Sequence, residues 1–560
     1  MKAADRIKKV SFAELIMYIS LLAVGVFHVY LSCLLSVALL AWLCVRIIKK
    51  GRLCLKWDFC FAAVLIMTVA YAVTPLWAID GGEAIFGFFK FLPLPLYSLV
   101  LMQEEGGKEK VKENLPYVVA VMTILSLALM YIPALSSYFS VSGRLSGFVQ
   151  YPNTFAIILL VCELWLITKE KPEIIDYLCI LVLLFGILYT GSRTVFVLAL
   201  ISNLVAIFTV KNKKLRITVL ATLGGAVVLV LLYCLITDSF GVISRYLNIS
   251  VLESTFVGRL LYAQDILPTL LSHPFGIGYM GYYFLQRSVQ TGIYSVMFIH
   301  NDLLQIALDV GWIPCILLII AIVKTVLNPA VALRNKIILI TFVAHTLFDF
   351  DLMYVAVFMM LMLFLQTKEQ KAVEIKKKSA AVSLAVVLSC IGLYFGTVQL
   401  LTRFEVHTLA AKLYPANTIS ETALIKEAAT PLEAAELGEK IIKRNKYVSV
   451  AYSVVGRYAY TKGDFAKVIT YKTKTIEAAP FAAGEYKEYA TMLINGIKLY
   501  TQAGDSKSAQ ICKDELLALD NLLAAQRERV STLGSKIDPQ PTLYFPTDIA
   551  EQIKALREEN

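Results

Sequence analysis

The sequence has few charged residues for its length. Of 560 residues, 17% are charged and 58% are hydrophobic, whereas a soluble domain averages about 25% charged residues. A soluble protein of this composition could not cover its surface with polar groups, so an ordinary soluble enzyme and a disordered chain are both excluded. The composition predicts an all-α, polytopic membrane helical bundle with room for one soluble appendage.

Several signatures of common enzymes and transporters are missing. The sequence has no Walker loop and no HExxH pair, so ATP-driven transport and zinc proteolysis have no support. Its ten cysteines include no CxxC pair and no Cys/His zinc spacing. We therefore expect no disulfide framework, no metal and no cofactor.

Long apolar runs fill the first 401 residues. A bilayer core of about 30 Å needs roughly 17–25 apolar residues per helix. Runs near this length predict about 12–13 transmembrane helices, and the eleventh and twelfth runs are short enough to form one helical hairpin. The runs cover residues 12–28, 30–46, 58–77, 84–102, 115–134, 153–168, 174–190, 194–210, 217–236, 302–323, 337–349, 352–366 and 379–400.

Lysine and arginine are unevenly distributed between the predicted loops. With the N-terminus in the cytoplasm, the inside segments carry 26 of these residues, and the outside segments up to residue 401 carry five. The positive-inside rule then predicts a multi-pass bacterial cytoplasmic-membrane protein whose C-terminus lies outside. Membrane orientation explains this basic excess, so we expect no nucleic-acid partner. The five outside residues are all arginines: Arg144, Arg193, Arg245, Arg259 and Arg287.

Two features are predicted to leave the membrane on the outer side. Residues 237–300 form a long extracytoplasmic loop, and residues 402–560 form a tail rich in Ala, Leu, Lys and Glu with helical spacing. Within the tail, 452–480 resembles one tetratricopeptide repeat, so we expect an extracytoplasmic helical repeat domain. A plain helical bundle is the alternative. In either case the tail would contact a protein partner or pack over the membrane domain. The repeat-like positions are Tyr452, Val455, Gly456, Gly463, Asp464, Phe465 and Pro480.

The arginines and one histidine of the outer segments suit a phosphate-linked substrate. Arginine keeps its charge and offers a planar fork of donors for phosphate oxygens. A histidine such as His300 can accept a proton from a sugar hydroxyl. Taken singly, each arginine could instead be a membrane anchor, and the histidine a satisfied polar residue.

Ionisable residues within the spans are further candidates. Lys90 could add positive charge for phosphate or pair with Glu163. The motif 349–351, Asp-Phe-Asp, matches the two-aspartate motif by which nucleotide-sugar enzymes hold a metal. We expect these two aspartates to cap a short helical turn instead.

Five short motifs occur in order between residues 143 and 311. They are Gly143-Arg144-Leu145-Ser146-Gly147 with Pro152-Asn153, Gly191-Ser192-Arg193, Gly258-Arg259, Ser272-His273-Pro274-Phe275-Gly276-Ile277-Gly278, and the segment from His300 through Asn301-Asp302 to Gly311. In order and spacing, residues about 140–330 resemble the O-antigen ligase and O-antigen polymerase family of bacterial membrane glycosyltransferases.

The resemblance implies a C-type glycosyltransferase fold and a metal-independent reaction outside the cytoplasm. A glycan would move from undecaprenyl diphosphate to a hydroxyl of a glycan, lipid or protein acceptor. By resemblance, Arg193 and Arg259 would bind the donor diphosphate, and His300 would be the catalytic base. Arg144, Asn153, Asp302 and Lys90 would be auxiliary. Val197 stands where the ligase pattern often has Leu, which leaves ligase and polymerase both open.

Two other functions remain open from the sequence. A lipid-linked glycan flippase or other polysaccharide transporter predicts internal repeats and charges near the membrane midplane. A non-catalytic scaffold predicts that the arginines and the histidine can all be replaced without loss.

Overall fold

A computed structural model describes residues 10–209, 213–237, 246, 254–367, 372–376, 378–539 and 543–559. Arg245 and most of the N-terminal part of the expected 237–300 loop lie outside these ranges. The chain divides into two compact units. The first contains Met1–Val73, Phe86–Ser250 and His300–Thr397, and the second contains Thr74–Ile85, Val251–Ile299 and Val398–Asn560.

The protein is all-α and polytopic, as the sequence predicts, with four short strands in the described residues. Within the described ranges, six shorter helices are apolar and five helices are long and apolar enough to cross a membrane: Val29–Lys50, Phe59–Leu76, Gly81–Gln103, Gly107–Leu129 and Lys378–Arg403. The helices that lie in the first unit or begin there are α1 (Phe12–Leu22), α2 (Val29–Lys50), α3 (Phe59–Val73), α5 (Phe86–Phe91), α6 (Pro93–Gln103), α7 (Gly107–Leu129), α8 (Ser136–Phe139), α9 (Pro152–Ile167), α10 (Ile174–Thr190), α11 (Arg193–Thr209), α12 (Lys213–Thr237), α16 (Asp302–Val310), α17 (Trp312–Leu327), α18 (Leu333–Thr346), α19 (Val355–Phe364) and α20 (Lys378–Arg403).

Two antiparallel strand pairs accompany these helices. Strand β1 (Leu53–Lys56) pairs with β4 (Ala372–Ile375), and β2 (Ser140–Val141) pairs with β3 (Arg144–Leu145). The second pair is a tight hairpin whose second strand begins at Arg144. The hairpin therefore fixes the backbone of the first predicted arginine.

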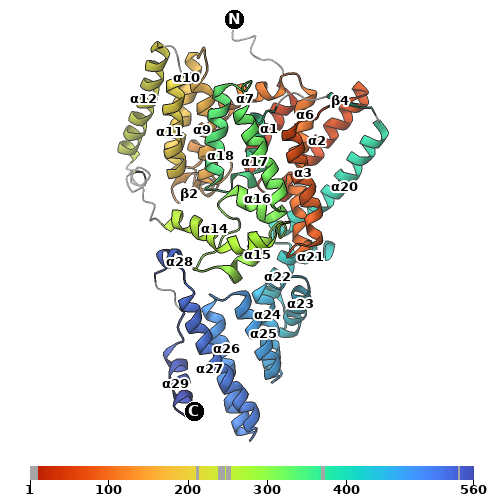
Figure 1. The fold of residues 1–560 in the computed structure, drawn as a ribbon, viewed down its shortest axis with the longest axis vertical. Coiled ribbons are helices and arrows are strands. Elements are labelled where there is room, and N and C mark those ends of the chain that lie inside the picture. The colour runs from red at the N-terminus through yellow and green to blue at the C-terminus, as the bar shows by residue number, and fades with distance from the viewer. Residues whose placement is uncertain are drawn as a thin grey trace. The chain divides into compact units, whose positions relative to one another are not determined.

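Helices α9 and α19 form the centre of the first unit. In α9 every residue is buried except Asn153, and all ten residues of α19 are buried. Helix α9 contacts α7, α10, α11 and α18 (Figure 1). A helix that is apolar on all sides is stable only inside a bundle. The ten residues of α19 would span about 15 Å, so α19 does not cross a bilayer core alone.

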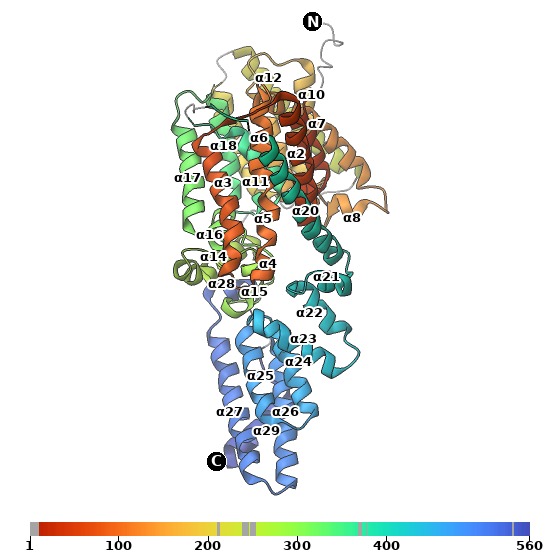
Figure 2. The same cartoon turned by 90° about the vertical axis from the view of Figure 1, so that its right-hand side faces the viewer.

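The peripheral helices of this unit expose apolar side chains. On α11, Leu200, Leu204 and Phe208 are 59%, 57% and 70% exposed. On another side of the unit, α3 packs along α17 (Figure 2). Exposed leucine and phenylalanine on a helix of this length fit contact with lipid rather than with water.

Two predicted spans are interrupted in the structure. Helix α1 ends at Leu22, and the 302–323 run is divided at Gly311, whose φ is 90°. After α1, the short turn η2 (Val24–Val26) has three successive positive φ angles of 52°, 59° and 57°. The sequence concealed these breaks because apolar residues continue across each of them.

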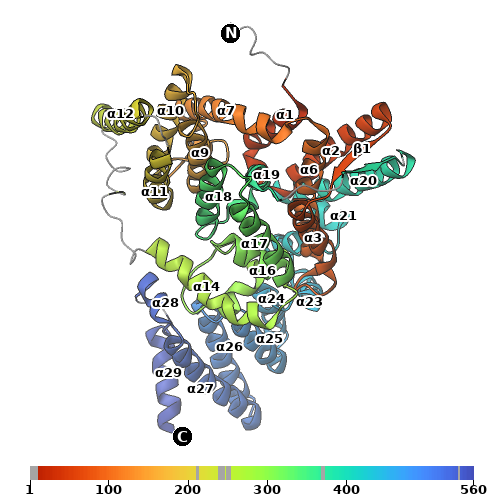
Figure 3. The same ribbon diagram turned by 45° about the horizontal axis from the view of Figure 1, so that its top comes forward.

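The second unit contains the tail and parts of two earlier segments. Its elements are η3 (Thr74–Leu76), α4 (Gly81–Ala84), α14 (Ser254–Ser272), α15 (Gly281–Val289), α21 (His407–Leu413), α22 (Thr418–Glu427), α23 (Pro431–Arg444), α24 (Ser449–Thr461), α25 (Phe465–Ala478), α26 (Ala483–Gln502), α27 (Ser506–Glu528), α28 (Thr532–Ile537) and α29 (Thr547–Glu559). Successive tail helices pack in pairs, with α24 on α25 and α26 on α27 (Figure 3). The tail is helical, and its assignment to tetratricopeptide repeats stays a prediction.

The end of the tail binds the segment that follows α14. The amide of Ser531 donates to the carbonyl of Thr291 at 2.9 Å, and the hydroxyl oxygens of Thr291 and Ser531 lie 2.9 Å apart. Two glycines allow this approach, because a Cβ added at Gly534 would lie 2.3 Å from the Thr291 carbonyl oxygen. The second glycine is Gly292, where an added Cβ would lie 2.7 Å from the Gly534 Cα.

Replacing Gly534 by alanine is expected to release α28 from this segment. In a helix interior, alanine is normally more stable than glycine by about 1 kcal/mol. A loss of stability in Gly534→Ala would therefore come from the steric clash, which typically costs about 1–3 kcal/mol. Hydrogen exchange of 286–292 and 529–537 in the full-length protein should become faster. Gly484→Ala is the control, because its Cβ would meet nothing within 4 Å. Unchanged exchange in Gly534→Ala would contradict the close packing.

Candidate functional site

Arg144 connects three segments of the first unit. Its Nε donates to the Thr190 carbonyl at 2.7 Å, and its Nη2 donates to Asn153 Oδ1 at 2.7 Å. Thr190 is the last residue of α10, and Gly191 closes that helix with a φ of 61°. Arg193 begins α11 directly after this turn. The structure therefore brings Arg144, Asn153 and the turn that carries Arg193 together.

The 349–351 motif provides the next contacts. Asp349 accepts hydrogen bonds from Tyr151 Oη at 3.0 Å and from Asn153 Nδ2 at 2.8 Å. Asp351 accepts from Thr154 Oγ1 at 2.7 Å and lies 2.5 Å from His345 Nδ1. The expected capping role is wrong for Asp351, because its carboxylate joins α9 to α18 rather than closing its own turn.

Aromatic rings connect this carboxylate layer to His300. The ring of His300 lies edge-on to Phe350 with a centroid distance of 5.0 Å, and Phe350 stacks on Tyr151 at 4.9 Å. The His300, Phe350 and Tyr151 side chains are only partly buried, whereas Asp349 and Asp351 are fully buried. A partly exposed imidazole, whose Nδ1 is buried, and two partly exposed aromatic rings thus adjoin a buried polar layer, an arrangement that suits a sugar ring and its hydroxyl groups.

Asp302 has a structural contact within this cluster. It is fully buried, and its Oδ2 accepts from the amide of Leu352 at 3.0 Å. The neighbouring Asn301 caps α16, since its Oδ1 accepts from Leu304 N at 3.0 Å. The cap fixes the start of α16 immediately after His300. Asp302 therefore ties that start to the turn after the 349–351 motif.

Lys90 does not pair with Glu163. Its Nζ donates to the Phe27 carbonyl at 2.5 Å and interacts electrostatically with Asp309, while Glu163 accepts from Asn203 at 3.3 Å. Phe27 follows η2 and packs on Tyr354 with a ring distance of 4.7 Å. The fully buried Lys90 thus stabilises the backbone after the left-handed turn.

Arg259 lies in the second unit, on α14. Burial raises the pKa of the nearby Tyr262 phenol, and the charge of Arg259 acts in the opposite direction. Asp265 lies one helical turn after Tyr262. Burial raises the pKa of its carboxyl group, although hydrogen bonds from Thr291 and Tyr294 act in the opposite direction. These bonds fix α14 against the segment that α28 also binds. The convergence of Arg259 with Arg193 and His300 stays a prediction.

Comparison with known families gives one match. Residues 178–319 match the family model described as O-antigen ligase. This segment is similar to O-antigen ligases. The match covers about a quarter of the chain and includes Arg193, Arg259 and His300. The resemblance seen in the motifs is confirmed over these residues, and the match supports, in general, a multi-pass bacterial membrane glycosyltransferase of the O-antigen ligase or polymerase type. No curated protein matches the chain.

Sequence reasoning gave no site role to four residues of this cluster. Tyr151, His345, Phe350 and Asp351 lie outside the segment matched to the O-antigen ligase, yet they contact one another or the predicted residues. The paired aspartates were a visible signal, but their partners lie almost 200 positions away. In the described ranges, no group of three or more His, Cys, Asp or Glu side chains has the geometry of a metal site.

Proposed function

We propose that this O-antigen ligase-type protein transfers a glycan from undecaprenyl diphosphate to a hydroxyl acceptor on the outer face of the cytoplasmic membrane. The observation that carries the proposal is the joined cluster of Arg144, Asn153, Asp349, Phe350 and His300 at the helix ends of the first unit. It combines a fixed cation, aromatic faces and an imidazole. The proposal places the N-terminus in the cytoplasm and the tail outside.

The proposed chemistry is a single displacement. His300 takes the proton of the acceptor hydroxyl, and the oxygen forms a bond to the anomeric carbon of the donor. The bond from that carbon to the diphosphate breaks, and undecaprenyl diphosphate leaves with the electron pair. Arg193 and Arg259 stabilise the charge that develops on the diphosphate oxygens. Arg144 contacts the donor glycan or a phosphate, and Asn153 holds Arg144 in place.

A turnover assay tests the reaction and separates its two forms. The purified protein would be placed in liposomes with an undecaprenyl-diphosphate oligosaccharide and a chelator. A ladder of longer lipid-linked glycans means a polymerase. Free undecaprenyl diphosphate that appears only with an added lipid or protein acceptor means a ligase. No turnover with any acceptor would contradict the proposal.

Replacing Arg259 by lysine is expected to lower kcat/KM for the donor by about tenfold or more. Lysine keeps the charge but cannot form the bidentate contact of a guanidinium with phosphate oxygens, and a hydrogen bond to a charged group contributes about 1.5–3 kcal/mol. The same assay with varied donor concentration measures the change. Arg287→Lys on α15 is the control. An unchanged kcat/KM in Arg259→Lys would contradict the diphosphate role.

A further inference from the structure

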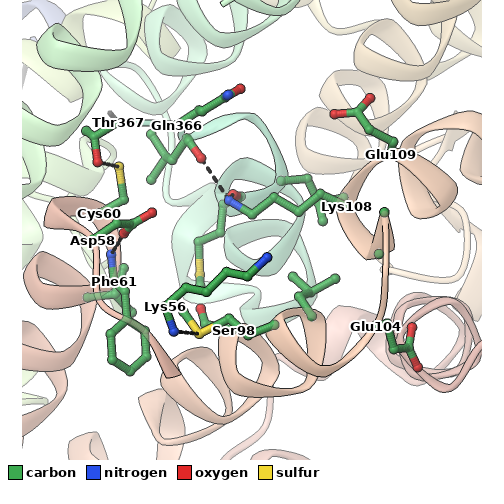
Figure 4. A pocket seen from close by; sticks show the side chains of 18 of the residues that line it. Lys56, Asp58, Cys60, Phe61, Ser98, Glu104, Lys108, Glu109, Gln366 and Thr367 are labelled. Atoms are coloured by element: carbon green, nitrogen blue, oxygen red, sulfur yellow. Dashed lines mark hydrogen bonds between the residues drawn. The ribbon is translucent and has the colours of Figure 1, made fainter. Parts of the chain in front are cut away.

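A cavity of about 490 Å³ lies within the first unit, away from the residues proposed for catalysis. Its walls come from β1, β4 and the adjoining ends of α3, α6, α7 and α19 (Figure 4). Its size falls within the range of small-ligand sites. Apolar side chains line one part of it, including Phe61, Leu101 and Met362, and charged side chains line another.

The acidic residues of this cavity are committed to structural contacts. Asp58 accepts from the amide of Phe61 at 2.5 Å. Glu104 accepts from the amides of Phe12 and Ala13 at 3.1 and 3.4 Å, at the start of α1. Glu109 forms an ion pair with Lys112. These carboxylates thus stabilise two helix N-termini and one lysine, and Asp58 and Glu109 also interact electrostatically with Lys108.

Two lysines remain directed at the cavity. Figure 4 shows the ammonium groups of Lys56 and Lys108 near its middle, with the Glu104 and Glu109 carboxylates to one side. Lys108 donates to the carbonyls of Met362 and Leu365 at 3.2 and 2.8 Å, and an ammonium has a third N–H. In the part of the chain that the structure describes, neither lysine is recorded in an ion pair within 4.0 Å.

We propose that this cavity binds a phosphate-bearing anion through Lys56 and Lys108. An anionic phospholipid is the source we favour, because apolar side chains adjoin the two ammonium groups at the ends of membrane helices. Basic pockets between such helices are known to suit phosphate headgroups. The site is separate from the glycosyl-transfer residues, and it does not depend on the proposed reaction.

The test measures lipid binding by native mass spectrometry of the full-length protein in detergent. Phosphatidylglycerol is the probe, phosphatidylcholine is the neutral comparison, and sn-glycerol 3-phosphate is the soluble phosphate ester. Lys56→Gln is preferred to a change at Lys108, since Lys108 also contacts the end of α19. We expect Lys56→Gln to weaken phosphatidylglycerol binding about fivefold. Lys56→Arg should restore binding, and Lys110→Gln, at an exposed lysine outside the cavity, should leave it unchanged.

Each outcome has a definite meaning. Binding of phosphatidylglycerol alone, dependent on Lys56, assigns the cavity to a lipid headgroup. Binding of glycerol 3-phosphate with the same dependence supports phosphate recognition and assigns it to a soluble ester. Equal binding of the anionic and neutral lipids, or equal effects of Lys56→Gln and Lys110→Gln, would overturn the proposal.

Discussion

Replacing His300 by alanine is expected to slow glycan transfer by about 10³-fold while donor binding stays within twofold of the wild type. A positioned general base contributes roughly 10²–10⁴ to the rate, because it removes a proton as the acceptor oxygen attacks. The imidazole precedes the cap of α16, and its edge lies against Phe350, so its position is fixed from two directions. The liposome assay measures turnover, and a donor titration of the same variant measures binding.

A second variant separates proton transfer from packing. His300→Phe keeps a ring next to Phe350 but removes both imidazole nitrogens, so turnover should fall as far as in the alanine variant. His407→Ala is the control, because His407 lies on α21 and its Nδ1 is 3.4 Å from Ser420 Oγ. Recovery of activity in His300→Phe would assign the residue a packing role. Wild-type turnover in His300→Ala would remove it from the mechanism.

The helices of the first unit could be predicted because each depends on a local property. An apolar run of sufficient length predicts a membrane helix wherever it occurs, and each predicted run contains a helix in the structure. The positions of the helix ends were harder to predict from the sequence. The left-handed turn at Val24–Val26 is stabilised by Tyr354 and Lys90, which lie more than 60 positions away. No local signal encodes that support.

The candidate site was predicted only in its residue types. Motifs named Arg144, Asn153, Asp302 and His300, and the structure places these four in one unit. The sequence could not show that Asp349 joins Tyr151 to Asn153, because both contacts connect segments almost 200 residues apart. Without those contacts, two aspartates around a phenylalanine resemble ordinary caps. Two roles were left open for Lys90, added charge for phosphate and a pair with Glu163, because its contact with the Phe27 carbonyl joins residues 63 positions apart.

The tail contains a buried charge on which three helices depend. Lys472 of α25 is fully buried, and its Nζ donates to Ser453 Oγ at 3.1 Å and to Glu485 Oε2 at 2.7 Å. It also forms an ion pair with Glu488. Arg457 of α24 donates to Glu488 from Nε at 2.6 Å. One ammonium therefore connects α24, α25 and α26.

Replacing Lys472 by methionine is expected to destabilise these three helices by about 3–5 kcal/mol. Methionine fills similar space but cannot form an ion pair, so Glu485 loses its pair with Lys472 and Glu488 keeps only its pair with Arg457. Breaking a buried ion pair carries a cost of this size. Hydrogen exchange of α24, α25 and α26 in the full-length protein measures the loss. Lys467→Met is the control, since the Lys467 side chain is 68% exposed and pairs only with Asp464. Equal protection in both variants would contradict the role of Lys472.

The cluster of Lys472, Arg457, Glu485 and Glu488 should make the stability of the tail depend on pH. Burial alone would raise the pKa of Glu488, but hydrogen bonds from Arg457 and Lys472 outweigh it, and the pKa lies below its ordinary value. Such a carboxylate stabilises the fold above the pKa of the unfolded chain, about 4.3, and this contribution disappears as the pH falls through the lower folded-state pKa. Protection of α24–α26 should therefore be constant between pH 7 and about pH 5 and fall below about pH 4. In Lys472→Met the pKa of Glu488 rises, so the loss should begin at a higher pH. An identical pH dependence in the two proteins would show that Lys472 does not stabilise the ionised Glu488.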